Sequence, residues 1–408
     1  MGVAEVPPPI DIRGLCLFVV SGGRGLTVTN ALRLQPGERE MQTEQVVPLA
    51  LPRGRKVFCE LCRAPATVRC GGCGVTFYCE VEHQSADWVS VHEKICQLLI
   101  PLRTVSPFYD SEKKRQHGQE QKISREKFLA ELTHSVAQKC LFEGKHEDAI
   151  PAALHSLKFT ISVHGWNSIE LVPAYLMLAE ASLGLGHLSQ AEEYLSHAQW
   201  SILKTPQCSP TIQSKLHRNL GLLYAAKGNF EESLYHLAND VFHASCASGT
   251  NDVAVSGGYF HMADVFFRQN RMDVADSLYT EVTEIWYNHF SRLIDHQFES
   301  LLSPAEINVL PEEETTGDLL DESQQAEATQ MLNAILEIRE QASKPQPAKV
   351  AKVVFALAMF HYLILDIPKA HELMKKTLRI TKTVPVEGLE ESVHRLVKLI
   401  KSKPFYTK

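Results

Sequence analysis

The sequence has no apolar run near the roughly 18 residues that a membrane-spanning helix needs. Its one apolar stretch near the start, residues 15–20, is too short for the apolar region of a signal peptide. Val6 stands where an N-myristoylation motif requires Ser or Thr. Positive charge is not in excess either, because the net charge is -7 and the pI is about 6.2. A mildly acidic chain suits a nucleic-acid backbone poorly. These absences predict a cytoplasmic protein that binds neither membranes nor nucleic acids.

Cysteine is scarce outside one short segment. Six of the ten cysteines lie within residues 59–96. In a reducing compartment such clustering favours metal binding over disulfides. The scattered cysteines are interpreted as plain small hydrophobic residues; they are Cys16, Cys140, Cys208 and Cys246.

The cysteine-rich segment has the ligand spacing of zinc sites. Eight candidate ligands form four pairs: Cys59 and Cys62, Cys70 and Cys73, Cys79 and His83, His92 and Cys96. Pairs with two intervening residues suit tight turns, and pairs with three suit one face of a helix. Eight ligands hold two tetrahedral Zn²⁺ ions, and the spacing allows either sequential or interleaved pairing. Because protein would fill every coordination position, both ions are expected to be structural, and they would supply the folding free energy that about 40 residues cannot supply alone.

The phrase Tyr78-Cys79-x3-His83-Gln84-x2-Asp87-Trp88-x3-His92-x3-Cys96 resembles the MYND finger. The resemblance implies interleaved pairing, with Cys59, Cys62, Cys79 and His83 on one zinc and Cys70, Cys73, His92 and Cys96 on the other. It also implies binding of Pro-rich peptides at a surface that includes Gln84 and Trp88, although Trp88 is equally suited to pack as core. The sequence departs from the family at His83, where Cys is usual, and in one extra residue between Trp88 and His92.

A repeat with a period of 42 residues follows the finger. Small residues recur at one position, turn residues stand five positions earlier, and further small residues stand twelve positions earlier. The three sets are Ala149, Ala191, Ser233 and Ala275; Gly144, Gly186, Gly228 and Asn270; and Ala137, Ala179, Gly221 and Ala263. Two antiparallel helices approach closely where side chains are small, and stacked helix pairs form a solenoid. The pattern predicts four helix pairs.

The phrase from Asn219 to Tyr224, followed by Gly228-Asn229-Phe230, resembles the tetratricopeptide repeat, and the long period is similar to that of kinesin light chains. In such an array the first helix of each pair lines a groove. Lys215, Arg218 and Asn219 are therefore candidate partner-binding residues, for an acidic or phosphorylated segment, although each alone is also compatible with a solvent-facing helix residue. On this interpretation Arg218→Ala weakens partner capture with little effect on the melting temperature.

A lysine methyltransferase is the enzymatic alternative. Residues 21–26 and 34–38 are similar to the opening of SET-and-MYND methyltransferases, in which a Gly-rich turn helps to hold S-adenosylmethionine. That family also requires an Asn-His-x-Cys-x-Pro stretch after the finger, and here Asn288-His289 continues as Phe290-Ser291. A lone Gly-rich turn is a weak signal. No other catalytic set stands out, since most of the 18 histidines, such as His155, occupy surface-like positions of the repeats. The sequence predicts no enzyme.

The predicted fold is mainly α: a small two-zinc MYND finger followed by an α-solenoid of tetratricopeptide-like helix pairs. The expected parts are an irregular extension with one strand at 15–20 (1–50), the finger (56–97), a connector (97–118) that leads into a polar run at 112–121, the repeats (120–298), an acidic insert with a helix (299–347), and a terminal helix pair with a capping helix (348–402). The expected function is a protein-interaction adaptor with two structural zinc ions. Resemblance to small MYND proteins linked to motile cilia and flagella places it at the axoneme or in dynein-arm assembly; a nuclear corepressor-type adaptor is the other alternative.

Overall fold

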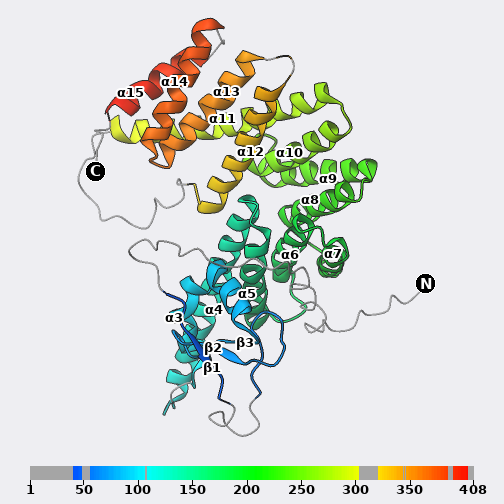
Figure 1. Ribbon diagram of the computed structural model, residues 1–408, viewed down its shortest axis with the longest axis vertical. Helices are drawn as coiled ribbons and strands as arrows, with labels where there is room; N and C mark the ends of the chain where they lie inside the picture. The colour runs from blue at the N-terminus through cyan, green and yellow to red at the C-terminus, as the bar shows by residue number, and fades with distance from the viewer. Residues whose placement is uncertain are drawn as a thin grey trace. The chain divides into compact units, whose positions relative to one another are not determined.

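The computed structural model describes residues 40–47, 56–105, 108–302, 320–342, 344, 346–384 and 389–402. Helices dominate, which confirms the predicted mainly α class (Figure 1). The chain divides into two compact units, residues 1–201 and 202–408. Within the described residues, no helix is both long enough and apolar enough to cross a membrane.

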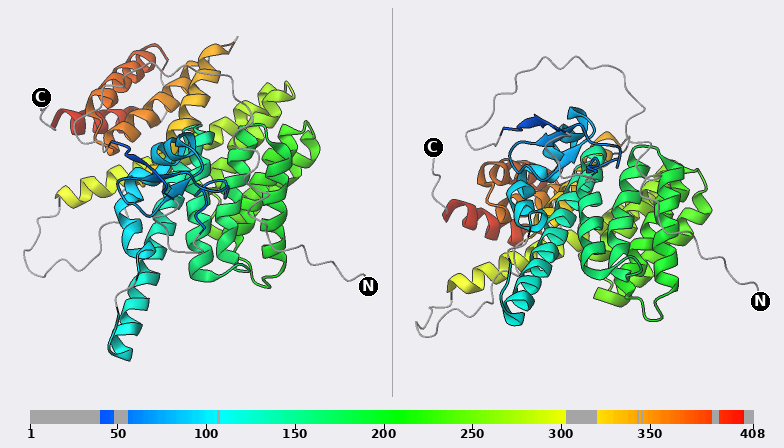
Figure 2. Two further views of the ribbon diagram at one scale, coloured as in Figure 1. Left: turned by 60° about the horizontal axis from the view of Figure 1, so that its bottom comes forward. Right: turned by 90° about the horizontal axis from the view of Figure 1, so that it is seen from below.

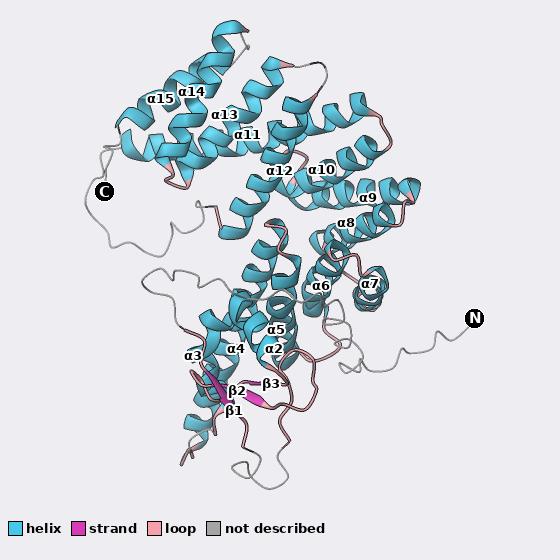
Figure 3. Cartoon of the chain, in the orientation of Figure 1, coloured by secondary structure: helices cyan, strands magenta, loops and turns pink. Residues whose placement is uncertain are grey.

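The first unit begins with the finger. A three-stranded antiparallel sheet has the order β1 (Thr43–Gln45), β2 (Val68–Cys70) and β3 (Phe77–Tyr78), and Figure 3 shows these strands close together. Helix α2 (Val81–Asp87), a π-helical turn η2 (Trp88–His92) and α3 (Glu93–Arg103) follow. Buried Val68, Tyr78, Ile95 and Leu99 form the small apolar core. Such a small apolar core is typical of a fold that is completed by bound metal.

Two helical hairpins complete the first unit. They are α4 (Glu112–Phe142) with α5 (His146–His164), and α6 (Val172–Gly184) with α7 (Leu188–Leu203); a short 3₁₀ turn, Ile169–Leu171, precedes α6. The interpretation of residues 112–121 as a connector is wrong, because this polar run forms the first turns of α4. Ser111 caps that end by accepting a hydrogen bond from the Lys114 amide. Figure 2 shows these turns extending beyond α5. They therefore need no apolar face, and the sequence there has no apolar periodicity that would predict a helix.

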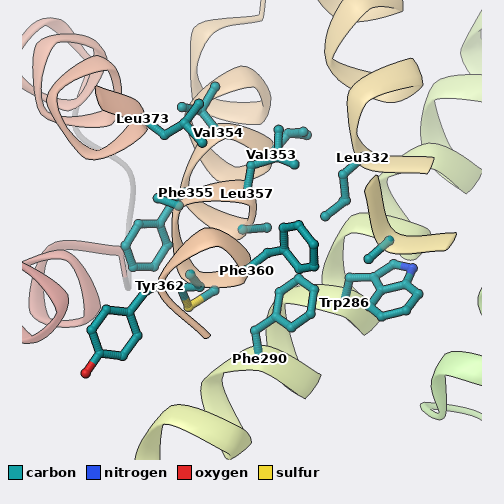
Figure 4. Packing of buried hydrophobic residues seen from close by; sticks show 14 of the residues in the cluster. Trp286, Phe290, Leu332, Val353, Val354, Phe355, Leu357, Phe360, Tyr362 and Leu373 are labelled. Atoms are coloured by element: carbon teal, nitrogen blue, oxygen red, sulfur yellow. The ribbon is translucent and has the colours of Figure 1, made fainter. Parts of the chain in front are cut away.

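The second unit contains two hairpins and a larger helical cluster. The hairpins are α8 (Pro210–Ala226) with α9 (Phe230–Ser248), and α10 (Val253–Arg268) with α11 (Met272–Leu302). The remaining helices are α12 (Glu322–Gln341), α13 (Pro347–Leu363), α14 (Ile367–Thr383) and α15 (Leu389–Ser402). Their core centres on buried Trp286, Phe290 and Phe360, whose rings lie together in Figure 4. Aromatic burial of this extent is a main source of stability for the unit.

The hairpins share the register that the sequence predicts. The small residues Ala149, Ala191, Ser233 and Ala275 are at most 1% exposed. The turn residues Gly144, Gly186, Gly228 and Asn270 have φ of 73°, 77°, 77° and 60°. A Cβ on Gly221 would lie 2.6 Å from Cγ of Leu237, so the close approach of α8 and α9 requires glycine there. The same offsets recur in the last pair, where Ala358 and Ala370 flank Leu365, whose φ is 64°.

Several expectations lie outside the described residues. They are the strand at 15–20, the segments similar to a methyltransferase opening, and most of the acidic insert. The described end of the insert has a defined role, because Asp321 and Gln324 form a reciprocal capping box at the start of α12. The helix expected within residues 299–347 corresponds to α12.

Candidate metal centre

Two groups of four ligand side chains converge in the finger. Cys59, Cys62, Cys79 and His83 form the first group, and Cys70, Cys73, His92 and Cys96 form the second; within each group all ligand atoms lie within 4.8 Å of one another. This arrangement selects the interleaved pairing and excludes the sequential one. Successive ligand pairs along the chain therefore belong to alternate sites. Each site joins one Cys-x2-Cys turn to one ligand pair with three intervening residues.

Two distances in each group fit a tetrahedral ion. Zinc bonds of about 2.3 Å to sulfur and 2.0 Å to nitrogen place neighbouring ligand atoms roughly 3.5–3.8 Å apart. In the first group Sγ of Cys62 and Sγ of Cys79 are 3.5 Å apart, and Sγ of Cys59 is 3.5 Å from Nδ1 of His83. In the second group Sγ of Cys70 and Sγ of Cys96 are 3.8 Å apart, and Sγ of Cys73 is 3.7 Å from Nε2 of His92. The residues therefore fit two Zn²⁺ ions.

One thiol in each group is disposed to ionise. A hydrogen bond from Cys70 lowers the pKa of Cys73 to about 3, against the opposing effect of burial. Burial raises the pKa of Cys59, but hydrogen bonds from His83 and from backbone amides outweigh it and hold the pKa at about 6. The thiolate is the form that binds metal, so both groups are prepared for a cation.

The extra residue before His92 is absorbed by a wider helical turn. Residues Trp88–His92 form one π-helical turn between α2 and α3. A π-helical turn accommodates a one-residue insertion inside an otherwise α-helical segment. The π-helical turn therefore keeps His92 and Cys96 on the second metal site despite the extra residue. Val91, within this turn, is buried at 1% exposure.

The two histidine ligands use different nitrogens. His83 presents Nδ1 to the first group, where Sγ of Cys79 is 3.0 Å away. His92 presents Nε2 to the second group, and its Nδ1 lies 3.4 Å from Oδ2 of Asp87. A carboxylate behind a zinc-bound histidine fixes the orientation and tautomer of the ring and raises its basicity. Asp87 is thus a positioning residue for the second zinc site.

Asp87 also connects the finger to α5. The carboxylate is 0% exposed, accepts a 2.6 Å hydrogen bond from Oη of Tyr78, and lies 2.9 Å from Nε2 of His155 in α5. Burial opposes ionisation of Asp87, but His155 and His92 hold its pKa well below the usual range. The interpretation of His155 as a surface-like residue is wrong: its side chain is 0% exposed because it closes this network.

A second carboxylate, which is only partly exposed, repeats the connection. Glu60 is 2.9 Å from Nη1 of Arg103 in α3 and 3.0 Å from Nζ of Lys158 in α5. Burial opposes its ionisation, yet these two cations lower the pKa of Glu60 far below its usual value. Ser90 adds a hydrogen bond to the backbone carbonyl of Asp148. The finger and the first hairpin therefore share one buried polar interface within the first unit.

The two finger residues expected to bind partners occupy different environments. Trp88 is half-buried, with its ring 5.8 Å from that of His92. Gln84 is 0% exposed, and its Nε2 donates a 2.9 Å hydrogen bond to the carbonyl of Gln42, the residue before β1. The chain's own residue Gln42 therefore contacts Gln84.

The candidate groove residues contact the protein itself. Arg218 donates to Asp240 of α9 at 2.8 Å and to the carbonyl of Ala254 in α10 at 2.8 Å. Asn219 is 3% exposed and donates to the carbonyl of Lys215 at 3.1 Å. The expectation that loss of Arg218 leaves stability unchanged does not fit these contacts, because Asp240 is a buried charge. Partner binding at Lys215, Arg218 and Asn219 stays a prediction.

The geometry defines a structural two-zinc finger with every ligand supplied by protein. The family model of the MYND finger matches residues 59–96, so this finger is a MYND finger. Among solved structures, the chain is similar to the crystal structure of BtubC (BKLC) from P. vanneervenii. The identity is 15%, the match covers 62% of this chain and 91% of that chain, and the TM-score is 0.27. At that TM-score the likeness supports no argument about fold or function.

Proposed function

We propose that the chain is a non-enzymatic adaptor that brings proteins together through its MYND finger and its helical hairpins. The closed ligand sets carry the proposal, since each metal group has four protein ligands and leaves no coordination position for water or substrate. An ion with four protein ligands stabilises the fold around it and takes no part in a reaction. The hairpins support the same role, because stacked helix pairs offer long surfaces for peptides.

The proposed partners are proteins. A Pro-rich segment would bind the finger near Gln84 and Trp88, and a peptide or axonemal protein would bind the hairpins near Lys215, Arg218 and Asn219. The proposed setting is the axoneme of a motile cilium or sperm flagellum, or the assembly of its dynein arms. This setting is supported by the sequence resemblance alone.

Affinity capture with matched cysteine variants tests the adaptor role. The tagged full chain is compared with Cys96→Ser, which opens one zinc site, and with Cys246→Ser, which changes an exposed cysteine outside the finger. Proteins captured from ciliated or testis tissue should be lost with Cys96→Ser and retained with Cys246→Ser. Identical captured sets for all three proteins would show that the finger recruits nothing. Enrichment of nuclear corepressors in place of axonemal proteins would favour the nuclear alternative.

The enzymatic alternative has a separate test. Calorimetry should detect no binding of S-adenosylmethionine to the zinc-loaded full chain, because the sequence lacks the Asn-His-x-Cys-x-Pro stretch. Micromolar binding that disappears in Gly23→Ala or Gly25→Ala would establish a methyltransferase-like site and overturn the non-enzymatic proposal.

A further inference from the structure

The sheet of the finger includes a strand from outside the zinc-binding segment. Strand β1 pairs antiparallel with β2, with Thr43 opposite Cys70, Glu44 opposite Arg69 and Gln45 opposite Val68. The Gly71 amide donates to the carbonyl of Gln42, and the Val46 amide donates to that of Thr67, both at 2.8 Å. Residues 42–46, named here the covering strand, thus occupy the edge of β2 that would otherwise be open.

Little apolar surface holds the covering strand. Thr43, Glu44 and Gln45 are all exposed, so burial of their side chains contributes almost nothing. The strand is attached by backbone hydrogen bonds, by Gln84, and by the ion pair of Glu44 with Arg69 at 2.6 Å, whose side chains are 50% and 44% exposed. Exposed ion pairs and single hydrogen bonds contribute little each. This attachment suits exchange better than permanent structure.

The edge of β2 is shaped to accept a backbone. Gly71 leaves space beside the covering strand, because a Cβ there would lie 3.0 Å from Cβ of Gln42. Gln84 is buried yet aims its amide at the carbonyl of Gln42, so it recognises main chain and no particular side chain. Arg69 selects a side chain, namely a carboxylate opposite it. An incoming segment would therefore be extended, antiparallel to β2, and acidic at one position.

From these contacts we propose that residues 42–46 are an exchangeable intrachain strand, and that a partner protein binds the finger by replacing them with an extended segment of its own that carries a carboxylate opposite Arg69. The inference rests on the proposed role of the finger in peptide binding. A tethered strand competes at an effective concentration on the order of millimolar, so it weakens every external peptide. Release of the covering strand would then control when the finger binds.

Proline substitution separates exchange from misfolding. In an antiparallel pair every second residue forms hydrogen bonds with the neighbouring strand. Residues 42 and 46 form such bonds with β2, so the Glu44 amide also points toward β2, whereas the Gln45 amide points away from it. Glu44→Pro should therefore release the strand, and Gln45→Pro is the matched control. The probe is a fluorescein-labelled peptide with the sequence of residues 40–47. By polarisation, the full chain with Glu44→Pro should bind it at least about tenfold more tightly than the wild type or Gln45→Pro.

A charge exchange tests the selected carboxylate. In the Glu44→Pro background, Arg69→Glu should weaken the peptide about fivefold, and a peptide carrying Glu44→Lys should restore the affinity. Zinc content of two per chain in every variant shows that the finger is folded. A second measurement needs no variant: in the wild type the Val46 and Gly71 amides should exchange with deuterium at least about 100-fold faster than those of Thr67 and Cys70, which bond toward β3.

Three results would overturn the proposal. One is equal protection of the four amides. Another is equal or absent peptide binding to folded Glu44→Pro and wild type; if tissue capture still required the finger, the adaptor role would stand and strand exchange alone would fail. The third is a wild-type dimer, seen by light scattering, that Glu44→Pro dissociates, because the occupant of the edge would then be a second copy of the chain.

Discussion

Replacement of Asp87 by Asn tests the link between the second zinc site and the first hairpin. Asn keeps the size of the side chain but removes its charge and one acceptor oxygen. Asp87 is 0% exposed and contacts Tyr78, His92 and His155. The variant therefore changes a network that includes a metal ligand and a residue of α5, without creating a cavity.

The magnitude follows from the bonds that are lost. A hydrogen bond to a charged group contributes about 1.5–3 kcal/mol, and removal of one partner from a buried charged network costs about 3–5 kcal/mol. Asn retains one acceptor, for Tyr78 or for His155 but not for both. We expect the free energy of unfolding to fall by about 3 kcal/mol in excess zinc. Zinc affinity of the second site should fall about 10- to 100-fold, as for other carboxylates behind a histidine ligand.

Urea unfolding with excess zinc and competition with a chromophoric chelator measure the two effects. The control is Asp110→Asn, since Asp110 is exposed and pairs with the exposed Lys114 four residues along; it should change stability by less than about 0.5 kcal/mol. A double-mutant cycle with His155→Gln should give a coupling energy of about 1–3 kcal/mol. Unchanged zinc affinity together with zero coupling would refute the view that Asp87 joins the metal site to α5.

Three further predictions concern zinc, Arg218 and Leu365. Metal analysis should find two zinc ions per chain, and Cys79→Ser, unlike Cys246→Ser, should remove zinc and raise hydrogen exchange in α5 while most of the far-UV signal persists; one zinc or none in the wild type would contradict the ligand sets. Arg218→Ala should lower stability by about 3 kcal/mol because Asp240 loses its cation, whereas Arg268→Ala, at an exposed pair, should change it by under about 0.5 kcal/mol; equal effects would show that the pair is not structural. Leu365→Asn should stabilise the protein by about 0.5–1 kcal/mol in urea unfolding, since an ordinary L-residue at φ 64° costs roughly 1–2 kcal/mol; Leu203→Asn, in a helix, is the control and should give no gain.

Local spacing predicted the parts of the molecule that depend on near neighbours in sequence. The eight ligands followed from Cys and His spacing, and the hairpin register followed from small residues and turn glycines. The choice of interleaved pairing came from the family resemblance, because spacing alone allowed both pairings. These features are local, so short-range geometry constrains them strongly.

The remaining parts depend on contacts between distant segments. His155 lies 68 residues from Asp87, and no pattern around it indicates that it is buried against the finger. Repeat geometry places Arg218 in a predicted groove, and nothing in its own helix indicates the ion pair with Asp240 on α9. Strand β1 has three exposed residues and thus no apolar alternation to announce it. In each case the partner, and not the residue type, decides the environment.

The last hairpin shows which spacing this protein preserves. Ala358, Leu365 and Ala370 keep the internal offsets of twelve and five, although Ala370 follows Ala275 by 95 residues and not by a multiple of 42. The geometry inside a hairpin is therefore fixed by close helix packing, while the joint between hairpins accepts α12 and an acidic stretch. The hairpin is therefore the unit whose internal geometry is kept, and its joints tolerate connections of very different length. The same joints are where a binding sequence or a reporter can be grafted with the least disturbance to the packed helices.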